Sequence, residues 1–281
     1  MVVFIICTVR YTSTMVHVTT SIDICVGSLD PRICQDVLEI PLDARNTVSI
    51  GAASEVYQEK VLKFDAVEIE SLMNDKYRQA GTTCWSTEEY KSSEHGKANA
   101  HVGLFEIHYL PNPKQAPRWW TNVEGKTSAS RPLFGLKIVD LTRIIASPAV
   151  TRELAELGAS VMRITSPNIT DMTILNLDMG WGKWNAYLDL TKEEDRKALR
   201  SLIEECDVVV DGYRPGVMKK WGFGKEEILG FFAVKDCGVI YAHENCYVRI
   251  FFVIASVHFD DILLDLRDGT DRGQIVPGGN K

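Results

Sequence analysis

Short apolar runs alternate with amphipathic segments over residues 131–247, and this is the most regular pattern in the chain. The runs 137–141 (KIVDL), 207–210 (DVVV) and 239–242 (VIYA) have the length and apolar content of buried strands, and 160–164 has a similar composition. Amphipathic segments separate these runs. Strands that alternate with helices favour an α/β fold, a Rossmann-like, mostly parallel sheet with flanking helices.

Two of the predicted helices carry start signals. In the first, Ser147 is expected as the N-cap and Pro148 as the first helical residue, with Gly158 as the stop. In the second, Thr191 is expected as the N-cap, with Glu194 at the capping-box position. The predicted apolar stripes are Val150, Leu154 and Leu157 in the first helix, and Ala198, Leu199, Leu202 and Ile203 in the second. The first strand, turn and helix predict a ligand crevice at the carboxyl end of that strand.

The rest of the chain is less regular. We expect an irregular N-terminal segment at 1–56 and a helical region at 57–110, which together form a smaller irregular α+β region. Residues 111–130 are rich in Pro, Gly, Ser and Thr and read as a linker. The α/β domain then spans 131–247, and a divergent tail spans 248–281.

Composition narrows the class of protein. The formal charge of −7 without clustered Lys or Arg argues against nucleic-acid binding. Seven cysteines without a CxxC pair suggest neither a zinc site nor a disulfide framework, so a reducing compartment fits best. We expect the cytoplasm, with mitochondrion or peroxisome as alternatives. The apolar start of the chain is too short to span a bilayer and reads as a strand, so no membrane role is expected.

Several familiar chemical motifs are missing from the sequence. There is no GxGxxG dinucleotide fingerprint and no GxSxG nucleophile elbow. Gly182-Lys183 is rejected as a phosphate loop, because Trp184 replaces the required Ser or Thr and Leu177 replaces the first Gly. The histidines lack metal-ligand spacing, so no metal is expected. Generic motifs therefore do not identify the chemistry.

Four segments in order nevertheless resemble the first part of a class III CoA-transferase. They are PLFGLKIVDLTRIIASPAVTRELAELGASVMRITSP, GKWNAYLDL, DVVVDGYRPGVMKKWGFGKEEI and VIYAHENCY, all within 131–247. The family includes formyl-CoA transferase, carnitine CoA-transferase and the α-methylacyl-CoA racemases. The resemblance implies a Rossmann-like domain that holds coenzyme A as a substrate. It also implies an acyl-CoA and a carboxylic acid as small-molecule partners, and a homodimer of interlocked complete subunits.

The resemblance also implies which residues contact CoA. They are Ile145, Ala146, Leu188, Asp189, Leu190, Gly212, Tyr213, Arg214 and Lys220. Arg143 and Arg163 are expected at the same edge, where they could neutralise the CoA phosphates.

Each of these assignments has a purely structural alternative. The loop at Ile145 could be a packing turn, and Arg214 could be an exposed turn arginine. Asp189 could end a strand, and Arg163 could face solvent from its strand. These alternatives stay open at the level of the sequence.

The nucleophile is the main departure from the family. In these transferases an Asp in a GD turn attacks the acyl-CoA thioester and forms a mixed anhydride, after which CoA thiolate and the second acid exchange. No Asp of this sequence stands in that motif, so no catalytic residue is assigned and a truncation before the catalytic Asp is expected. The alternatives are a non-catalytic CoA-binding module or fragment, and an isomerase like the α-methylacyl-CoA racemases.

A looser resemblance lies upstream. The region 57–110 resembles the C-terminal part of a transferase, which reverses the usual order. This arrangement suggests a double-length fusion, in which the tail of one transferase-like half precedes the head of another.

Overall fold

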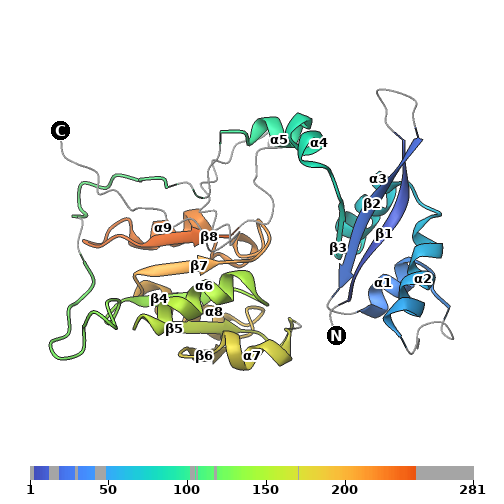
Figure 1. Ribbon diagram of the computed structural model, residues 1–281. Helices are drawn as coiled ribbons and strands as arrows, with labels where there is room; N and C mark the ends of the chain where they lie inside the picture. The colour runs from blue at the N-terminus through green and yellow to red at the C-terminus, as the bar shows by residue number, and fades with distance from the viewer. Residues whose placement is uncertain are drawn as a thin grey trace. The chain divides into compact units, whose positions relative to one another are not determined.

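The computed structural model describes most of the chain up to residue 244. The described residues are 3–12, 19–28, 31–41, 49–101, 105, 107–116, 119–169 and 171–244. The chain divides into two compact units, Met1–Ala100 and His101–Lys281, which are described separately (Figure 1). The predicted tail at 248–281 lies outside the described residues.

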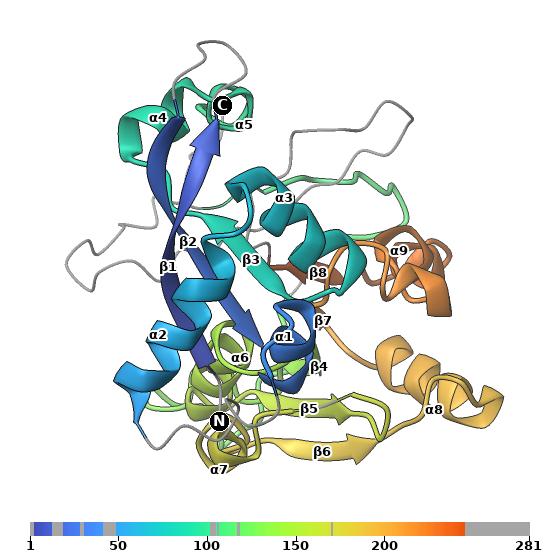
Figure 2. The ribbon, with the colours of Figure 1, turned by 90° about the vertical axis from the view of Figure 1, so that its right-hand side faces the viewer.

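The first unit is built on a three-stranded antiparallel sheet of order β1-β2-β3. Its elements are β1 (Val3–Thr12), β2 (Thr19–Ser28), α1 (Pro31–Val37), α2 (Ile50–Val61), α3 (Ala66–Ser71), the π-helical turn η2 (Leu72–Lys76), β3 (Ala80–Thr83), α4 (Thr87–Ser92) and α5 (Glu94–Ala98). Helices α1, α2 and α3 pack against this sheet (Figure 2). The strand expected at the start of the chain is confirmed as β1.

Local side-chain bonds and a small core explain the helices of this unit. Ser86 caps α4 in a complete capping box with Glu89. Asp65 caps α3 by accepting from the amide of Val67. The core joins α1, α2, α3 and η2 through Cys34, Val37, Leu38, Ile40, Tyr57, Val61, Ala66, Ile69 and Met73.

The second unit carries a five-stranded sheet of order β6-β5-β4-β7-β8, in which every strand pair is parallel. Its elements are β4 (Lys137–Leu141), α6 (Ala146–Glu156), β5 (Ser160–Thr165), α7 (Thr173–Met179), β6 (Trp184–Tyr187), α8 (Glu193–Glu204), β7 (Val208–Asp211), the 3₁₀ turn η3 (Lys219–Trp221), α9 (Lys225–Phe232) and β8 (Ile240–His243). The predicted α/β fold with a mostly parallel sheet is confirmed (Figure 1).

The start signals of two helices were misread. Helix α6 begins at Ala146 with Ile145 as its N-cap, so Ser147 lies inside the helix, where its hydroxyl donates to the carboxylate of Glu244. Helix α8 has Lys192 as its N-cap without a capping side chain, because the Thr191 hydroxyl donates to Asp189 instead. Both hydroxyls are used by tertiary or loop partners rather than by the helix ends.

The predicted apolar stripe of α6 is also wrong. The fully buried positions are Ser147, Pro148 and Thr151, whereas Leu157 is exposed. Leu154 alone of the predicted stripe packs against the buried cluster on this face of the sheet. Helix α6 therefore buries hydroxyl groups against the sheet.

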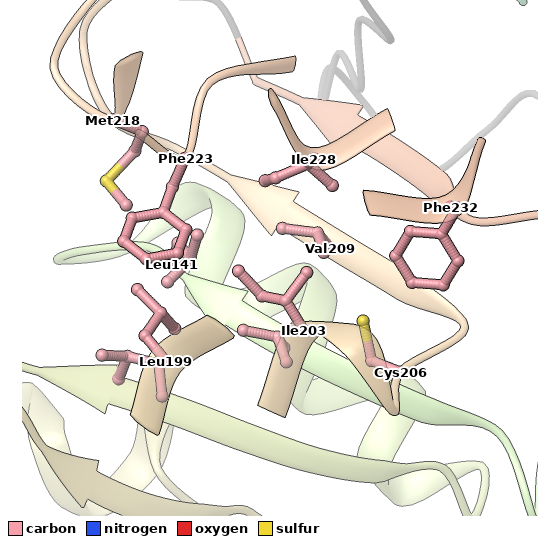
Figure 3. Close-up of a cluster of buried hydrophobic side chains, with 11 residues drawn as sticks. Leu141, Leu199, Ile203, Cys206, Val209, Met218, Phe223, Ile228 and Phe232 are labelled. Carbon is pink, nitrogen blue, oxygen red and sulfur yellow. The ribbon is translucent and has the colours of Figure 1, made fainter. Parts of the chain in front are cut away.

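The two faces of the sheet follow from the alternation of side chains along each strand. Val139 and Val209 point to the face covered by α8 and α9, where a large apolar cluster forms (Figure 3). Ile138, Val161 and Val210 point to the face covered by α6, where the apolar cluster is smaller. The larger cluster contains Val139, Leu141, Ile164, Leu199, Ile203, Cys206, Val209, Met218, Phe223, Ile228 and Phe232.

The segment predicted as a linker contacts the end of α9. The Gln115 amide donates to the carbonyl oxygens of Phe232 at 2.7 Å and Cys237 at 3.0 Å. Asn112 donates to the carbonyl of Ala233 at 3.0 Å. These bonds attach residues 112–115 to the second unit.

Candidate functional site

The strand order places a crevice where the chain reverses direction across the sheet. From β4 the chain adds β5 and β6 on one side, and it then returns to add β7 and β8 on the other. Ligands in open α/β sheets bind outside the carboxyl ends of the strands at such a switch point. The relevant loops are 142–145 after β4 and 212–214 after β7.

A small pocket opens at this edge. Its wall comes from the ends of β4 and β5, from the following loop and from the loop after β7. The lining residues are Thr142, Arg143, Ile164, Thr165, Ser166, Ile169, Asp171 and Tyr213. Of the predicted CoA contacts, Arg143 and Tyr213 meet here.

The loop after β4 carries backbone strain. Ile144 has φ of +74°, a left-handed conformation that a β-branched side chain rarely adopts. Such strain costs on the order of 1–3 kcal/mol and persists only where surrounding contacts hold it. The next residue, Ile145, ends the loop with its side chain half exposed, and Ala146 begins α6. The two predicted lip residues thus sit where loop becomes helix.

Gly212 allows the two crevice loops to approach each other. A Cβ at this position would lie 2.8 Å from Ser147 Oγ and 3.3 Å from Thr142 Cβ. These are contacts with the first turn of α6 and with the loop after β4. Because Gly212 has no side chain, the loop after β7 can lie close to the loop after β4 and to α6 at the base of the crevice.

Tyr213 follows Gly212 and lines the pocket. Burial raises the pKa of Tyr213 to about 12, against a smaller lowering by the Arg143 guanidinium. Near neutral pH the side chain therefore remains a hydroxyl donor beside a cation, an arrangement suited to a polar or anionic ligand.

Asp211, the last residue of β7, is a buried carboxyl group behind this loop. It accepts hydrogen bonds from the Tyr241 hydroxyl at 2.7 Å and from the Tyr213 amide at 2.9 Å. Burial raises the pKa of Asp211, and the Tyr241 bond and nearby His243 lower it in part. The bond from the Tyr213 amide holds the start of the loop 212–214, and the bond from Tyr241 joins Asp211 to β8.

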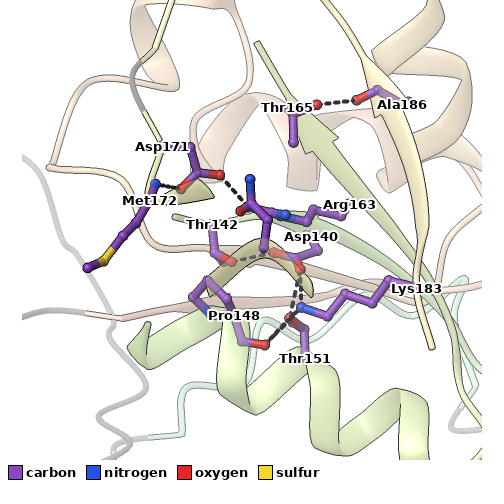
Figure 4. A network of polar contacts seen from close by, with 11 residues as sticks. Asp140, Thr142, Pro148, Thr151, Arg163, Thr165, Asp171, Met172, Lys183 and Ala186 are labelled. Carbon is purple, nitrogen blue, oxygen red and sulfur yellow. Dashed lines mark hydrogen bonds and ion pairs between the residues drawn. The ribbon is translucent and has the colours of Figure 1, made fainter. Parts of the chain in front are cut away.

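Arg163 does not face solvent or the pocket interior as a spare charge. It is buried on β5 and pairs with Asp171 at 2.5 Å, with a second bond to the Asn176 side-chain oxygen at 3.2 Å (Figure 4). The alternative in which Arg163 faces solvent is wrong, because the side chain is buried and bonds Asn176 of α7. Its charge is matched by Asp171, which itself lines the pocket.

A buried ionic network lies beneath the crevice. Asp140 of β4 and Lys183, in the turn before β6, pair at 2.9 Å with both side chains fully buried (Figure 4). Asp140 also accepts from the hydroxyls of Thr142 at 2.5 Å and Thr151 at 2.7 Å. Burial lowers the pKa of Lys183, while Asp140 raises it.

The segment 188–190 follows the edge strand β6. Leu188 and Leu190 pack against the large apolar cluster, as does Tyr213. Asp189 accepts from Thr191 and from the Asn168 side chain at 2.8 Å. The Thr191 bonds lower the pKa of Asp189. Because Asp189 also bonds Asn168, it joins the segment after β6 to the segment after β5.

Arg214 and Lys220 stand apart from the pocket wall. Arg214 is exposed in the turn after Tyr213. Lys220 is exposed on η3, with its Nζ 4.8 Å from the centre of the Trp221 ring. Neither lines the pocket in which Arg143 and Tyr213 meet.

Few features of the sequence point to the polar residues under the crevice. Asp140 lies in a run that reads as apolar, and Lys183 lies in a rejected phosphate-loop pattern. The parity of side chains along 137–141 could have placed Asp140 on the α6 face, opposite Val139. No sequence signal joins it to Lys183.

Among the residues that the structure describes, no cluster of His, Cys, Asp and Glu has the arrangement of a metal site. No helix in the described part of the chain has the length and apolar character needed to cross a membrane.

Comparison with known proteins gives a consistent match. Residues 133–233 match the family described as CoA-transferase family III. The acetyl-coenzyme A transferase nodX of Hypoxylon pulicicidum is 47% identical over 222 residues, which cover 79% of this chain and 37% of that protein. An acyl-CoA transferase of Gibberella moniliformis is 37% identical over 230 residues, covering 79% of this chain and 38% of that protein.

A solved structure also matches part of the chain. A CAIB/BAIF family protein from Brucella suis is 28% identical with a TM-score of 0.35, and the match covers 41% of this chain and 33% of that one. The chain spans 37–38% of the length of the two curated relatives above.

Proposed function

We propose that this chain belongs to CoA-transferase family III, whose model matches residues 133–233, and that it holds the CoA part of an acyl-CoA thioester at the carboxyl edge of β4 and β7. The observation that carries the proposal is the meeting of Arg143 and Tyr213 in one pocket at the switch point of the sheet. A fixed cation and a neutral hydroxyl donor suit the phosphate and amide groups of CoA.

The other predicted contacts take graded roles in this proposal. Ile145 and Ala146 offer backbone groups from the lip, and Gly212 lets the second loop approach it. Arg214 and Lys220 are exposed cations that supply longer-range attraction for the anionic ligand. Leu188, Asp189 and Leu190 shape the loop beyond β6.

In the proposed reaction of the whole protein, CoA passes from an acyl-CoA thioester to a carboxylic acid. A carboxylate oxygen attacks the thioester carbonyl, the C–S bond breaks, and CoA leaves as the thiolate while an anhydride forms. The described carboxylates near the crevice are engaged elsewhere: Asp140 by Lys183, Asp171 by Arg163, and Asp211 by Tyr241. We therefore assign CoA binding to the pocket of Arg143 and Tyr213 and leave the nucleophile unassigned.

The first unit is proposed to belong to the same longer protein. The matches to the two curated relatives cover 79% of this chain, far more than residues 133–233. This breadth supports the fusion hypothesis, in which the end of one transferase-like half precedes the start of another.

Calorimetric titration of the full chain with CoA tests the binding proposal. We expect saturable binding that Arg143→Ala weakens by about 10- to 100-fold, the loss expected for a charge-assisted contact. Arg200→Ala is the matched control, because Arg200 is exposed on α8, where it pairs with Glu204 and lies over the Phe231 ring. No binding by the wild-type chain, or equal affinity for both variants, would contradict the proposal.

A turnover assay separates binding from catalysis. Labelled CoA is supplied as an acyl-CoA with a panel of carboxylic acids, and transfer of the label to each acid is followed. Binding without transfer supports the assignment of a CoA-binding part that lacks its nucleophile. Transfer by the chain alone shows that a nucleophile lies within it and overturns that assignment.

A further inference from the structure

Lys183 occupies an unusual position for a lysine. Its side chain is fully buried in the turn between α7 and β6, and Gly182 before it has φ of +75°, a conformation that suits glycine. From this turn the Lys183 side chain reaches under the first turn of α6 (Figure 4).

All three ammonium donors of Lys183 have an acceptor. Nζ lies 2.9 Å from Asp140 Oδ2, 2.8 Å from the Pro148 carbonyl oxygen and 2.7 Å from Thr151 Oγ1. A buried ammonium with every donor satisfied is the condition under which such a charge is tolerated. The group is thus built into the fold.

The three acceptors lie on both sides of the strained lip. Asp140 precedes the loop 142–145 on β4 and holds the Thr142 hydroxyl, the first side chain of that loop. Pro148 and Thr151 follow the loop in the first turns of α6. One ammonium therefore ties the strand that enters the lip to the helix that leaves it.

We infer that Lys183 is a positioning residue of the CoA site, whose ammonium holds the loop 142–145 and the first turn of α6 in their binding geometry. The inference rests on the proposed function. Lys183 itself does not line the pocket; it acts through Asp140, Thr142 and the α6 backbone.

The chemistry of the network favours positioning over simple stability. Replacing a buried ion pair by apolar residues of similar volume is often neutral or stabilising, so a buried pair is weak evidence for stability alone. Here the pair joins residues that precede and follow Ile144, whose φ of +74° needs surrounding contacts to hold it. The network supplies those contacts on both flanks of the loop.

The experiment compares Lys183→Met with Lys235→Met in the full chain. Lys235 is a matched control, because its Nζ also donates to a helix carbonyl, that of Glu204 at 2.6 Å, at the end of α8. We expect Lys183→Met to weaken CoA binding by about tenfold or more, as loss of a supporting contact does at other sites, and Lys235→Met to leave it unchanged.

Hydrogen exchange gives a second readout that does not depend on CoA. The Ala149 amide donates to the Ile145 carbonyl at 2.8 Å and so reports on the first turn of α6. We expect faster exchange at Ala149 in Lys183→Met and unchanged exchange in Lys235→Met. If the wild-type chain failed to bind CoA, the proposed function would fall, whereas Ala149 exchange would still decide whether Lys183 holds the lip.

A double variant distinguishes positioning from folding. Lys183→Met combined with Asp140→Asn removes both charges, so no carboxylate is left buried without its partner. This double variant can be measured even if the single variant does not fold. Weak CoA binding and fast Ala149 exchange in this folded variant support the inference. Recovery of both to wild-type values, or no change in either readout in the single variant, overturns it.

Discussion

The two faces of the parallel sheet share the same strands but bury different chemistry. The face under α8 and α9 is an apolar cluster that includes Leu199 and Ile203. The face under α6 and α7 buries the ion pair of Asp140 and Lys183, and it also buries Arg163, which pairs with Asp171. The apolar face therefore stabilises the domain through contacts that have no preferred direction. The polar face uses directional bonds, which hold particular atoms under the crevice.

The largest expected effect lies on the polar face. Asp140→Leu leaves the Lys183 ammonium buried without its anion, so we expect a loss of about 3–5 kcal/mol in the free energy of unfolding. Asp140→Leu with Lys183→Met should regain most of this loss, because both charges are gone. Urea denaturation measures both; equal losses would show that the two residues are not coupled and would break the comparison.

The apolar face responds through cavity formation. Ile203 is fully buried in the cluster, and Ile203→Ala should cost about 2–5 kcal/mol of unfolding free energy, measured in urea. The lost contacts are on the face covered by α8 and α9, opposite the Asp140–Lys183 pair under the first turn of α6. CoA affinity under conditions where the variant remains folded should therefore be unchanged, and a large drop in affinity would argue against the division of roles between the faces.

Substitution by Ala should change the free energy of unfolding in opposite directions at two glycines. Gly212→Ala places a Cβ against Ser147 and Thr142, so we expect it to lower stability by about 1–3 kcal/mol and to weaken CoA binding. Gly230→Ala, on the exposed side of α9, meets nothing within 4 Å and should raise stability by about 0.5–1 kcal/mol. Thermal and urea unfolding compare the pair. A neutral Gly212→Ala would show that the crevice loops can separate.

The smallest effect is a difference in pH dependence between two carboxyl groups. Burial raises the pKa of Asp211 above its ordinary 3.8, so the native state holds this proton more tightly than the unfolded state. Its contribution to stability is present below pH 3.8 and is lost as the pH rises through its native pKa. Asp211→Asn should lack this loss.

Asp189 is the control of opposite sign. The Thr191 hydrogen bonds lower its pKa, so its contribution is present above pH 3.8 and is lost as the pH falls through its native pKa. The stability of each Asn variant relative to wild type, measured from pH 3 to pH 7, should therefore change in opposite directions. Parallel curves would contradict the assigned environments.

The apolar face was predictable because local periodicity records it. The stripe of α8 appears at helical spacing, and Leu199 and Ile203 from it are fully buried. The strand at 137–141 was placed with the bounds that the structure shows. The family resemblance then indicated the crevice loops, of which Arg143 and Tyr213 share one pocket.

The predicted helix starts failed for a physical reason. A hydroxyl near a helix end can bond to the helix amides or to another partner, and local sequence does not reveal which bond wins. Ser147 is taken by Glu244, 97 residues further along the chain, and Thr191 is taken by Asp189. In each case the helix begins without the expected cap.

By itself, the sequence determined the α/β class of residues 131–247, most of the strands and helices there, the buried positions of α8, and the resemblance to the CoA-transferase family. Tertiary structure alone decided that Asp140 and Lys183, 43 residues apart, share one buried site under the lip of the crevice. Periodicity reports whether a side chain points inward, because burial repeats with the geometry of strand and helix. It does not report which charged partner a buried residue will have, because Asp140 and Lys183 come together only when the strands are assembled into the sheet.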